Sequence, residues 1–355
     1  MEIGLLSKEE IRMKKILAVL FVMIMVIGLG SCGEKKETPK ADTPPEQEVK
    51  QDTATETQKT EDKAEIKTDK KILIGLSMHN QTADWAVKFK DTFLEQAKEL
   101  GAEVTWNDAN AVAATQVNNI EDLVAQGINV LVVVPADSTA LGQALKAAAD
   151  AGVKIINADS KVDEADRDLV ESFITADCYK GGYSLGEYLA DKLPENAVVG
   201  ALNYPQIAVI ADRFIGLQKA FEDKGRKDIT IIDKTCTDLN AIATYTEDMF
   251  MANPEISAFV CLNDNTALSC YGTCAQMGHK DCLVYGFDGS PAGKQSIANG
   301  EMSGTMVYSP IDLAKASCNT AYAAVTGGKY EKETLVDMWL ISPENIKERN
   351  LEAWE

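Results

Sequence analysis

One strand-and-helix unit is contained in residues 71–101, KILIGLSMHNQTADWAVKFKDTFLEQAKELG. The run Ile72 to Leu76 is apolar on consecutive residues, which is typical of a strand covered on both faces. Apolar residues then recur at spacings of three and four, as on one face of a helix: Ala86, Phe89, Phe93, Ala97 and Leu100. Gly101 follows as a helix stop. The segment therefore predicts a parallel strand and a helix that covers it.

The same alternation continues along the chain. Further short apolar runs lie at Val130 to Val134, Lys154 to Ile156, Phe173 to Thr175, Val198 to Leu202, Ile229 to Ile232, Ala258 to Leu262, Leu283 to Phe287 and Thr305 to Tyr308. Segments of helical length separate them, and one has Val117, Ile120, Leu123 and Val124 before Gly127. Buried strands that alternate with helices predict two α/β sheets of the doubly wound type.

Residues 1–32 have the pattern of a secretory signal. Lys14 and Lys15 precede an apolar run of 14 residues, 16–29, which is shorter than the roughly 20 residues of a membrane-spanning helix. The small residues Gly30 and Ser31 then lead to Cys32. This order resembles a bacterial lipobox, which implies cleavage before Cys32 and lipidation of its sulfur. An ordinary signal peptide and a short membrane anchor are the alternatives, and the chain can start at Met1 or Met13.

Residues 33–70 have a different composition. They contain 11 acidic and 8 basic residues and no aromatic residue. Such a segment cannot bury enough apolar surface to offset its chain entropy. We therefore expect a flexible acidic tether here.

Composition and motifs exclude several classes of function. The chain has 35 Lys and Arg against 55 Asp and Glu, a formal net charge of -20, so we expect no nucleic-acid partner. His79 and His279 are far apart in sequence, and we expect neither a metal nor another cofactor. Residues 289–295, GSPAGKQ, have one residue too few between the glycines for a phosphate loop. We expect no catalytic residues.

Polar and aromatic residues follow most of the apolar runs, and these are His79, Asn80, Asp84, Trp85, Asp159, Arg213, Asn263, Asp264 and Asp288. In an open parallel sheet, ligands bind beyond the carboxyl ends of the strands. Carboxylates accept hydrogen bonds, arginine donates them and asparagine does both, a mixture that suits a ligand rich in hydroxyl groups. Trp85 offers a flat apolar surface for the carbon-hydrogen face of a sugar ring.

Eight short motifs occur in a characteristic order. They are Ile74-Gly75-Leu76-Ser77 up to Trp85, Val134-Pro135-Ala136-Asp137-Ser138, Ile156-Asn157-Ala158-Asp159, Ala176-Asp177 up to Gly181-Gly182, Asp212-Arg213-Phe214-Ile215-Gly216, Asn263-Asp264, Gly286-Phe287-Asp288-Gly289 and Ile341-Ser342-Pro343-Glu344-Asn345. Together they resemble the type I periplasmic sugar-binding proteins of ABC transporters, in particular the ribose and galactose group.

The resemblance implies two Rossmann-like lobes with parallel sheets, joined by a three-stranded hinge, with the sugar held between them. We place the N-lobe at residues 71–176 plus about 309–335, and the C-lobe at 177–308 plus about 336–355. It also implies that Trp85 stacks on the sugar. The residues implied to hydrogen-bond it are Asp159, Arg213, Asn263 and Asp288. Further candidates are Asn80, Asp84, Val134, Ser160, Phe287 and Tyr308.

Each main candidate also has a structural alternative. Trp85 can belong to the core, Asp159 and Asp288 can cap helices, Arg213 can form a surface ion pair and Asn263 can form a turn.

Three departures from the family pattern bear on the ligand. Val134 stands where ribose binders carry Asn, Ser160 stands where they carry Arg, and Tyr308 stands where they carry Gln. The first two of these, Val134 and Ser160, remove two polar contacts and argue against ribose itself. They favour another monosaccharide, a polyol or a less hydroxylated ligand.

Seven cysteines follow Cys32, at positions 178, 236, 261, 270, 274, 282 and 318. An odd number cannot all pair within one chain. Buried free thiols are the favoured interpretation, while disulfides and a four-thiolate metal site remain open.

We expect a monomeric, extracytoplasmic lipoprotein, in the periplasm or at the cell surface, that binds a monosaccharide or polyol and delivers it to an ABC permease and its ATPase. The membrane contact is the lipid on Cys32. The alternative is a sensor for a nucleoside or a furanosyl signalling compound, coupled to a chemoreceptor or kinase. A sugar-responsive transcription regulator shares this fold, but a signal sequence stands here where it would carry its helix-turn-helix.

Overall fold

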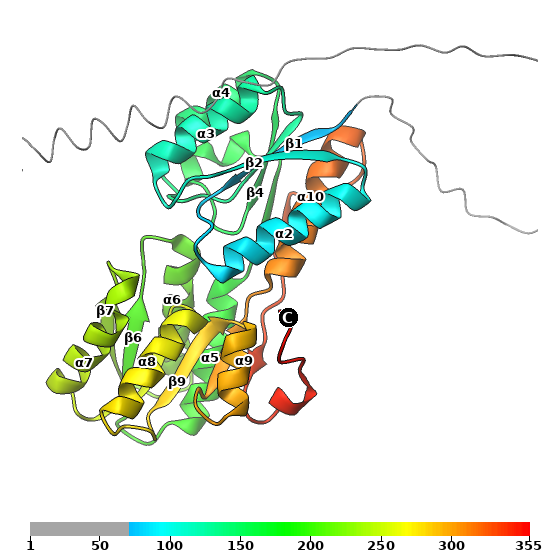
Figure 1. Cartoon of the computed structure of the whole chain (residues 1–355). Coiled ribbons are helices and arrows are strands. Elements are labelled where there is room, and N and C mark those ends of the chain that lie inside the picture. The colour runs from blue at the N-terminus through cyan, green and yellow to red at the C-terminus, as the bar shows by residue number, and fades with distance from the viewer. Residues whose placement is uncertain (1–70) are drawn as a thin grey trace, which may run out of the picture. The chain divides into compact units, whose positions relative to one another are not determined.

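The computed structural model describes residues 71–355, which form two α/β lobes (Figure 1). The expected signal peptide, Cys32 and the tether lie outside these described residues. We use N-lobe for the first sheet with its helices and C-lobe for the second.

The sheet of the N-lobe has six strands. They are β1 (Leu73–Met78), β2 (Glu103–Asp108), β3 (Val130–Val133), β4 (Lys154–Ala158), β5 (Ser172–Ala176) and β11 (Glu333–Val336). Their order is β11-β5-β4-β3-β1-β2, and every neighbouring pair is parallel. The helices of this lobe are α2 (Asp84–Glu99), α3 (Ala113–Ala125), α4 (Gly142–Asp150) and α10 (Pro310–Thr326). Helix α10 packs against α2 although more than 200 residues separate them (Figure 1).

The sheet of the C-lobe repeats this plan. Its strands are β6 (Val198–Asn203), β7 (Thr230–Thr235), β8 (Ile256–Cys261), β9 (Leu283–Asp288), β10 (Gly304–Val307) and β12 (Leu340–Ile341). The order is β12-β10-β9-β8-β6-β7, and only β12 runs antiparallel to its neighbour. The helices are α5 (Cys178–Lys192), α6 (Ala208–Asp223), α7 (Ile242–Ala252), α8 (Asp264–Gln276) and α9 (Pro291–Ala298).

The chain passes between the lobes three times. The passages lie between β5 and α5, between β10 and α10, and between β11 and β12. Two parallel sheets joined in this way confirm the predicted two-lobed fold with a three-stranded hinge.

Local sequence explains why the helices begin where they do near the hinge. Ser309 caps α10, because its side chain accepts a hydrogen bond from the backbone of Asp312 at 3.1 Å, and Pro310 occupies the first turn. The helix ends at Gly327, whose φ of 79° lies in the left-handed region that favours glycine. At Tyr308 and Ser309 the chain therefore passes directly from strand β10 of the C-lobe into helix α10 of the N-lobe.

Candidate ligand-binding site

A cavity of about 430 Å³ lies where the carboxyl ends of the two sheets face each other. From the N-lobe it is lined by His79, Asn80, Ala83, Trp85, Ala111, Ala113, Ala136, Asp137 and Asp159. From the C-lobe it is lined by Tyr204, Gln206, Ile207, Val209, Ile210, Arg213, Leu239, Leu262, Asn263, Asp288 and Tyr308. Hollows of about 560 and 710 Å³ lie elsewhere, but each is lined by one lobe alone. A further hollow of about 220 Å³ is lined by both lobes but contains none of the predicted residues, so within residues 71–355 only the 430 Å³ cavity gathers them.

The five residues with the strongest expectation all line this cavity: Trp85, Asp159, Arg213, Asn263 and Asp288. Asn80 and Tyr308 line it as well. Strands of a parallel sheet end at the same edge, so residues more than 200 positions apart meet at one place.

Four other candidates lie outside the lining, and they are Asp84, Val134, Ser160 and Phe287. Asp84 is exposed in the first turn of α2. Val134 is fully buried, and its carbonyl oxygen accepts a hydrogen bond from Gln116 Nε2 at 2.8 Å. Ser160 is also buried, and its Oγ has no hydrogen-bond partner among residues 71–355. Phe287 lies at the end of β9 with its ring in the core. Val134, Ser160 and Phe287 are thus buried and Asp84 is exposed, and none of these four candidates lines the cavity.

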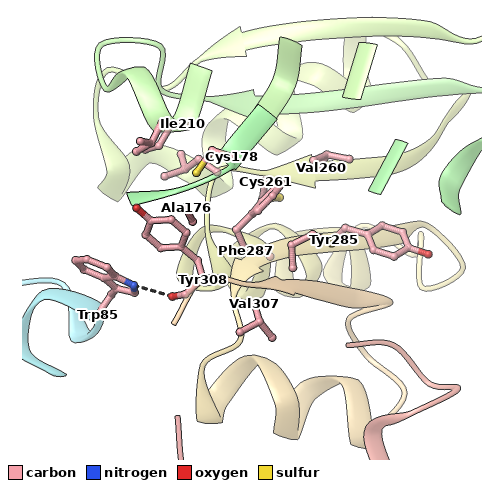
Figure 2. Packing of buried hydrophobic residues seen from close by; sticks show 14 of the residues in the cluster. Trp85, Ala176, Cys178, Ile210, Val260, Cys261, Tyr285, Phe287, Val307 and Tyr308 are labelled. Carbon is pink, nitrogen blue, oxygen red and sulfur yellow. Dashed lines mark hydrogen bonds between the residues drawn. The ribbon is translucent and has the colours of Figure 1, made fainter. Parts of the chain in front are cut away.

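Tyr308 connects the two lobes at the cavity. Its hydroxyl donates a hydrogen bond to Oδ1 of Asp159, which follows β4 of the N-lobe. Its carbonyl oxygen accepts one from Nε1 of Trp85 at 2.9 Å, the dashed line in Figure 2. The two rings also stack, with centroids 5.5 Å apart and planes inclined by 28°. The residue that replaces the family's glutamine therefore binds the aromatic and acidic residues of the opposite lobe.

Arg213 lies on α6 with its guanidinium between two aromatic rings. The guanidinium carbon is 4.7 Å from the ring centroid of Phe287 and 4.9 Å from that of Tyr308. Nη1 donates to the carbonyl oxygen of Leu262 at 2.6 Å, while buried Nε has no partner within the described chain. The stacking fixes the plane of the guanidinium and leaves donors available at the cavity.

Burial and charge act against each other in this site. Burial opposes the charge on Arg213, but neighbouring Cys178 and Asp288 outweigh it and raise the pKa of Arg213. Burial raises the pKa of Asp288 well above its ordinary value, the Asp264 carboxylate adds to the rise, Arg213 opposes it and Asp159 adds again. Burial and the neighbouring carboxyl groups thus disfavour the negative charge on Asp288, although Arg213 lies close.

Asp264 lies beneath the cavity and fixes the loop that carries Asp288. It is 1% exposed, and its carboxylate accepts hydrogen bonds from Ser290 N at 2.8 Å, Ser290 Oγ at 2.7 Å and Thr305 Oγ1 at 2.6 Å. A Cβ at Gly286 would lie 2.4 Å from Oδ1 of Asp264, so this position needs glycine. Burial raises the pKa of Asp264 to about 6, although the hydrogen bonds from Thr305 and Ser290 act against the rise.

The backbone is strained at two of the predicted acidic residues. Asp159 has a φ of 64° and Asp288 a φ of 117°, values that are uncommon outside glycine. Neither residue caps a helix of the described chain, because the residue at the start of α9 that does so is Ser290. Strained residues of this kind concentrate at ligand clamps.

Asn263 and Trp85 each have the structural role given above as an alternative, and each also lines the cavity. Asn263 caps α8, because its Oδ1 accepts from the backbone of Thr266 at 2.9 Å, and its amide nitrogen remains available. Trp85 is 8% exposed and stacks on Phe89 at 5.4 Å, so it belongs to the core and to the cavity wall.

Four polar lining residues were not among the predicted ligand contacts, and these are His79, Asp137, Tyr204 and Gln206. Burial lowers the pKa of His79, against the nearby Asp159 and Asp108, so the ring is neutral, and its buried Nδ1 has no partner in the described part of the chain. Asp137 stabilises its own turn by accepting from Thr139. The signal for Tyr204 and Gln206 was their place directly after β6.

The cysteines lie away from the cavity lining. All seven within residues 71–355 are buried and free. Sγ of Cys270 and Sγ of Cys274 are 4.0 Å apart on α8, yet no group of three ligating side chains in this part of the chain has metal-binding geometry.

Lys294, the residue that imitates a phosphate-loop lysine, has a structural role. It is fully buried, and its Nζ donates to the carbonyl oxygens of Asn350 at 2.7 Å and Ala353 at 2.6 Å. It also forms an ion pair with Glu355 at 2.9 Å. The lysine thus holds the C-terminal segment on α9.

Comparison with known proteins identifies the class of protein that this fold and cavity represent. Residues 74–329 match the family model described as periplasmic binding protein domain. The chain belongs to this family and is a type I periplasmic sugar-binding protein, as predicted.

Individual relatives are similar over most of their length. The ribose import binding protein of Bacillus subtilis is 29% identical over 266 residues, which are 74% of this chain and 85% of the relative. The xylitol-binding protein of Mycolicibacterium smegmatis is 21% identical and covers 77% of this chain and 78% of its own length. The structure of an ABC transporter solute binding protein from Mycobacterium smegmatis with bound glycerol is 27% identical, with a TM-score of 0.74 over 81% of this chain and all of that one. These relatives are solute-binding proteins and not enzymes.

Within residues 71–355 we find no helix with the length and apolar character needed to cross a bilayer.

Proposed function

We propose that this protein is the lipid-anchored solute-binding component of an ABC importer, which binds a monosaccharide or related polyol between its lobes and delivers it to a permease. The observation that carries the proposal is the cavity itself. It combines an aromatic wall at Trp85 with free donors on Arg213 and free acceptors on Asp288, and these come from different lobes. A ligand that bonds to both lobes at once favours their closure.

The apolar part of the lining narrows the class of ligand. Ile207, Val209, Ile210 and Leu239 line the cavity beside the polar cluster. A fully hydroxylated pyranose would leave some hydroxyl groups facing these side chains without partners, at a cost. The lining thus supports a ligand with an apolar face or a short polyol chain, and the similarity to xylitol-binding and glycerol-bound relatives agrees with this.

Binding is tested by thermal-shift screening of residues 71–355 against pentoses, hexoses, polyols, nucleosides and furanosyl signalling compounds, followed by calorimetry of each hit. A ligand specific for the folded state raises its apparent stability. A shift with a sugar or polyol supports the proposal. A shift only with a nucleoside or signalling compound would replace it by a sensor for that compound.

Two substitutions locate the ligand. Arg213→Ala and Asp288→Ala each remove charge-assisted hydrogen bonds at the cavity, and each is expected to weaken binding by on the order of 2 to 3 kcal/mol. Asp122→Ala is the matched control, because Asp122 is exposed on α3 and outside the lining. Unchanged binding in both cavity variants would show that the ligand binds elsewhere.

The lipid anchor is tested separately. Metabolic labelling with a fatty acid should mark the parent protein and not Cys32→Ala. Labelling of both proteins would exclude Cys32 as the lipidation site.

A further inference from the structure

The charges around the cavity do not balance. Three acidic side chains line it, those of Asp159, Asp288 and the solvent-exposed Asp137, against the single guanidinium of Arg213. No lysine lines the cavity, and burial keeps His79 neutral by lowering its pKa. Within residues 71–355, no ion pair joins Arg213 to any of these carboxylates.

The carboxylate of Asp288 is the least satisfied of the three. Asp137 accepts hydrogen bonds from Thr139, and Asp159 accepts one from the Tyr308 hydroxyl. Within residues 71–355 no group donates a hydrogen bond to the side chain of Asp288, which is half-buried and lines the cavity. Arg213 acts on this carboxyl group as a nearby charge but forms no ion pair with it, so its hydrogen-bond donors have to come from outside the chain.

The single guanidinium of this lining is partly engaged within the chain. The Arg213 guanidinium stacks between the rings of Phe287 and Tyr308 and donates to the carbonyl oxygen of Leu262. The resemblance places a second arginine where this chain has Ser160, whose buried Oγ has no partner within the described residues. An arginine at this position, next to the lining residue Asp159, would have added a second positive charge near the cavity.

We propose that the ligand supplies the missing charge, and that the cavity is selective for a sugar or polyol carrying one protonated amino group, with the ammonium bound at Asp288. This inference rests on the proposed function and names the class of its ligand. The rings of Trp85, Tyr204 and Tyr308 line the same cavity and add favourable surfaces for a cation. The hydroxyl groups of such a ligand bind Arg213 and Asn263.

Paired probes test the proposal by calorimetry at pH 7. Each pair differs by one hydroxyl and one ammonium group: glycerol and 2-aminopropane-1,3-diol, xylitol and 1-amino-1-deoxyxylitol, glucose and glucosamine, galactose and galactosamine. In at least one pair, the ammonium member is expected to bind about tenfold or more tightly than its neutral partner, as for a charge-assisted bond. Neutral members that bind as tightly as the ammonium members, or more tightly, would overturn the inference and leave the proposed function intact. Failure of every probe and of every neutral sugar and polyol would overturn both.

Variants separate the charge from the shape of the cavity. Asp288→Asn keeps the side-chain shape and should abolish the preference for the ammonium member, whereas Asp122→Asn, on the exposed face of α3, should keep it. Ser160→Arg restores a positive charge and should shift the preference toward the neutral member. Thermal unfolding first establishes that each variant folds, and if Ser160→Arg does not, the comparison of Asp288→Asn with the parent decides. A preference that persists in Asp288→Asn would contradict the assignment of the ammonium to this residue.

Discussion

The hydroxyl of Tyr308 stabilises the arrangement of the two lobes, and Tyr308→Phe removes it while keeping the ring. Tyr308 is 2% exposed, and its hydroxyl donates to the Asp159 carboxylate of the other lobe. A hydrogen bond to a charged group contributes about 1.5–3 kcal/mol, so we expect a loss of about 2 kcal/mol in the free energy of unfolding. For a body of this size the entropy of unfolding is about 0.6 kcal/mol/K, so Tm falls by about 3 °C.

The assay is urea and thermal unfolding of residues 71–355 without added ligand. Tyr330→Phe is the matched control, because the Tyr330 hydroxyl donates to Glu171 at 2.9 Å on a half-buried surface within one lobe. It should cost less than about 1 kcal/mol. A double-mutant cycle with Asp159→Asn should give a coupling energy of about 1–2 kcal/mol. A Tyr308→Phe protein as stable as its parent, or a coupling energy near zero, would refute the cross-lobe role of this hydroxyl.

Three further perturbations have defined outcomes. Burial raises the pKa of Asp264 from 3.8 to about 6, so ionisation of this carboxyl group costs the folded state up to about 3 kcal/mol, a penalty that is absent below pH 4 and complete above pH 6. In urea titrations, the stability of Asp264→Asn relative to the parent should therefore rise as the pH increases from 4 to 6. A stability difference that does not change with pH would contradict the raised pKa. Gly182→Ala places a Cβ 1.8 Å from a backbone oxygen of α6 and should destabilise the protein by about 1–3 kcal/mol or more. The Cβ of Gly272→Ala meets nothing within 4 Å, so this control should stabilise the protein by about 0.5–1 kcal/mol. Chemical unfolding of both variants measures the two differences. Lys294→Met removes a buried ammonium from three acceptors and should speed hydrogen exchange in the C-terminal segment, with unchanged exchange as the contrary result.

Continuous apolar runs made most of the strands predictable, and the missing strands share one physical property. Every run assigned to a strand, such as that of β3 with four fully buried residues, lies in one of the two sheets. The strands that were not predicted, β2, β11 and β12, lie at sheet edges, where one side faces solvent. In β2 the apolar residues alternate with polar ones, β11 has only two adjacent apolar residues and β12 is two residues long, so none of the three has the length and continuity of the central strands.

The site was predictable where the backbone alone determines position. Asp159, Asn263 and Asp288 end or follow strands, and parallel strands bring such residues to one edge. Contacts that depend on side-chain packing were not predictable. Ser160 directly follows Asp159 but does not line the cavity, and Tyr308 bonds to both Asp159 and Trp85 across the lobes.

The position of Trp85 gives the protein an optical signal of its own. The chain has four tryptophans, and Trp85 is the one that lines the cavity, while Trp106 is 41% exposed on β2. Emission from an indole depends on the polarity around its ring and on stacking with its neighbours, and here the neighbour is Tyr308 at 5.5 Å. A molecule that enters beside these two rings changes both properties at once. Occupancy of the cavity can therefore be followed by intrinsic fluorescence, in real time and without an attached dye.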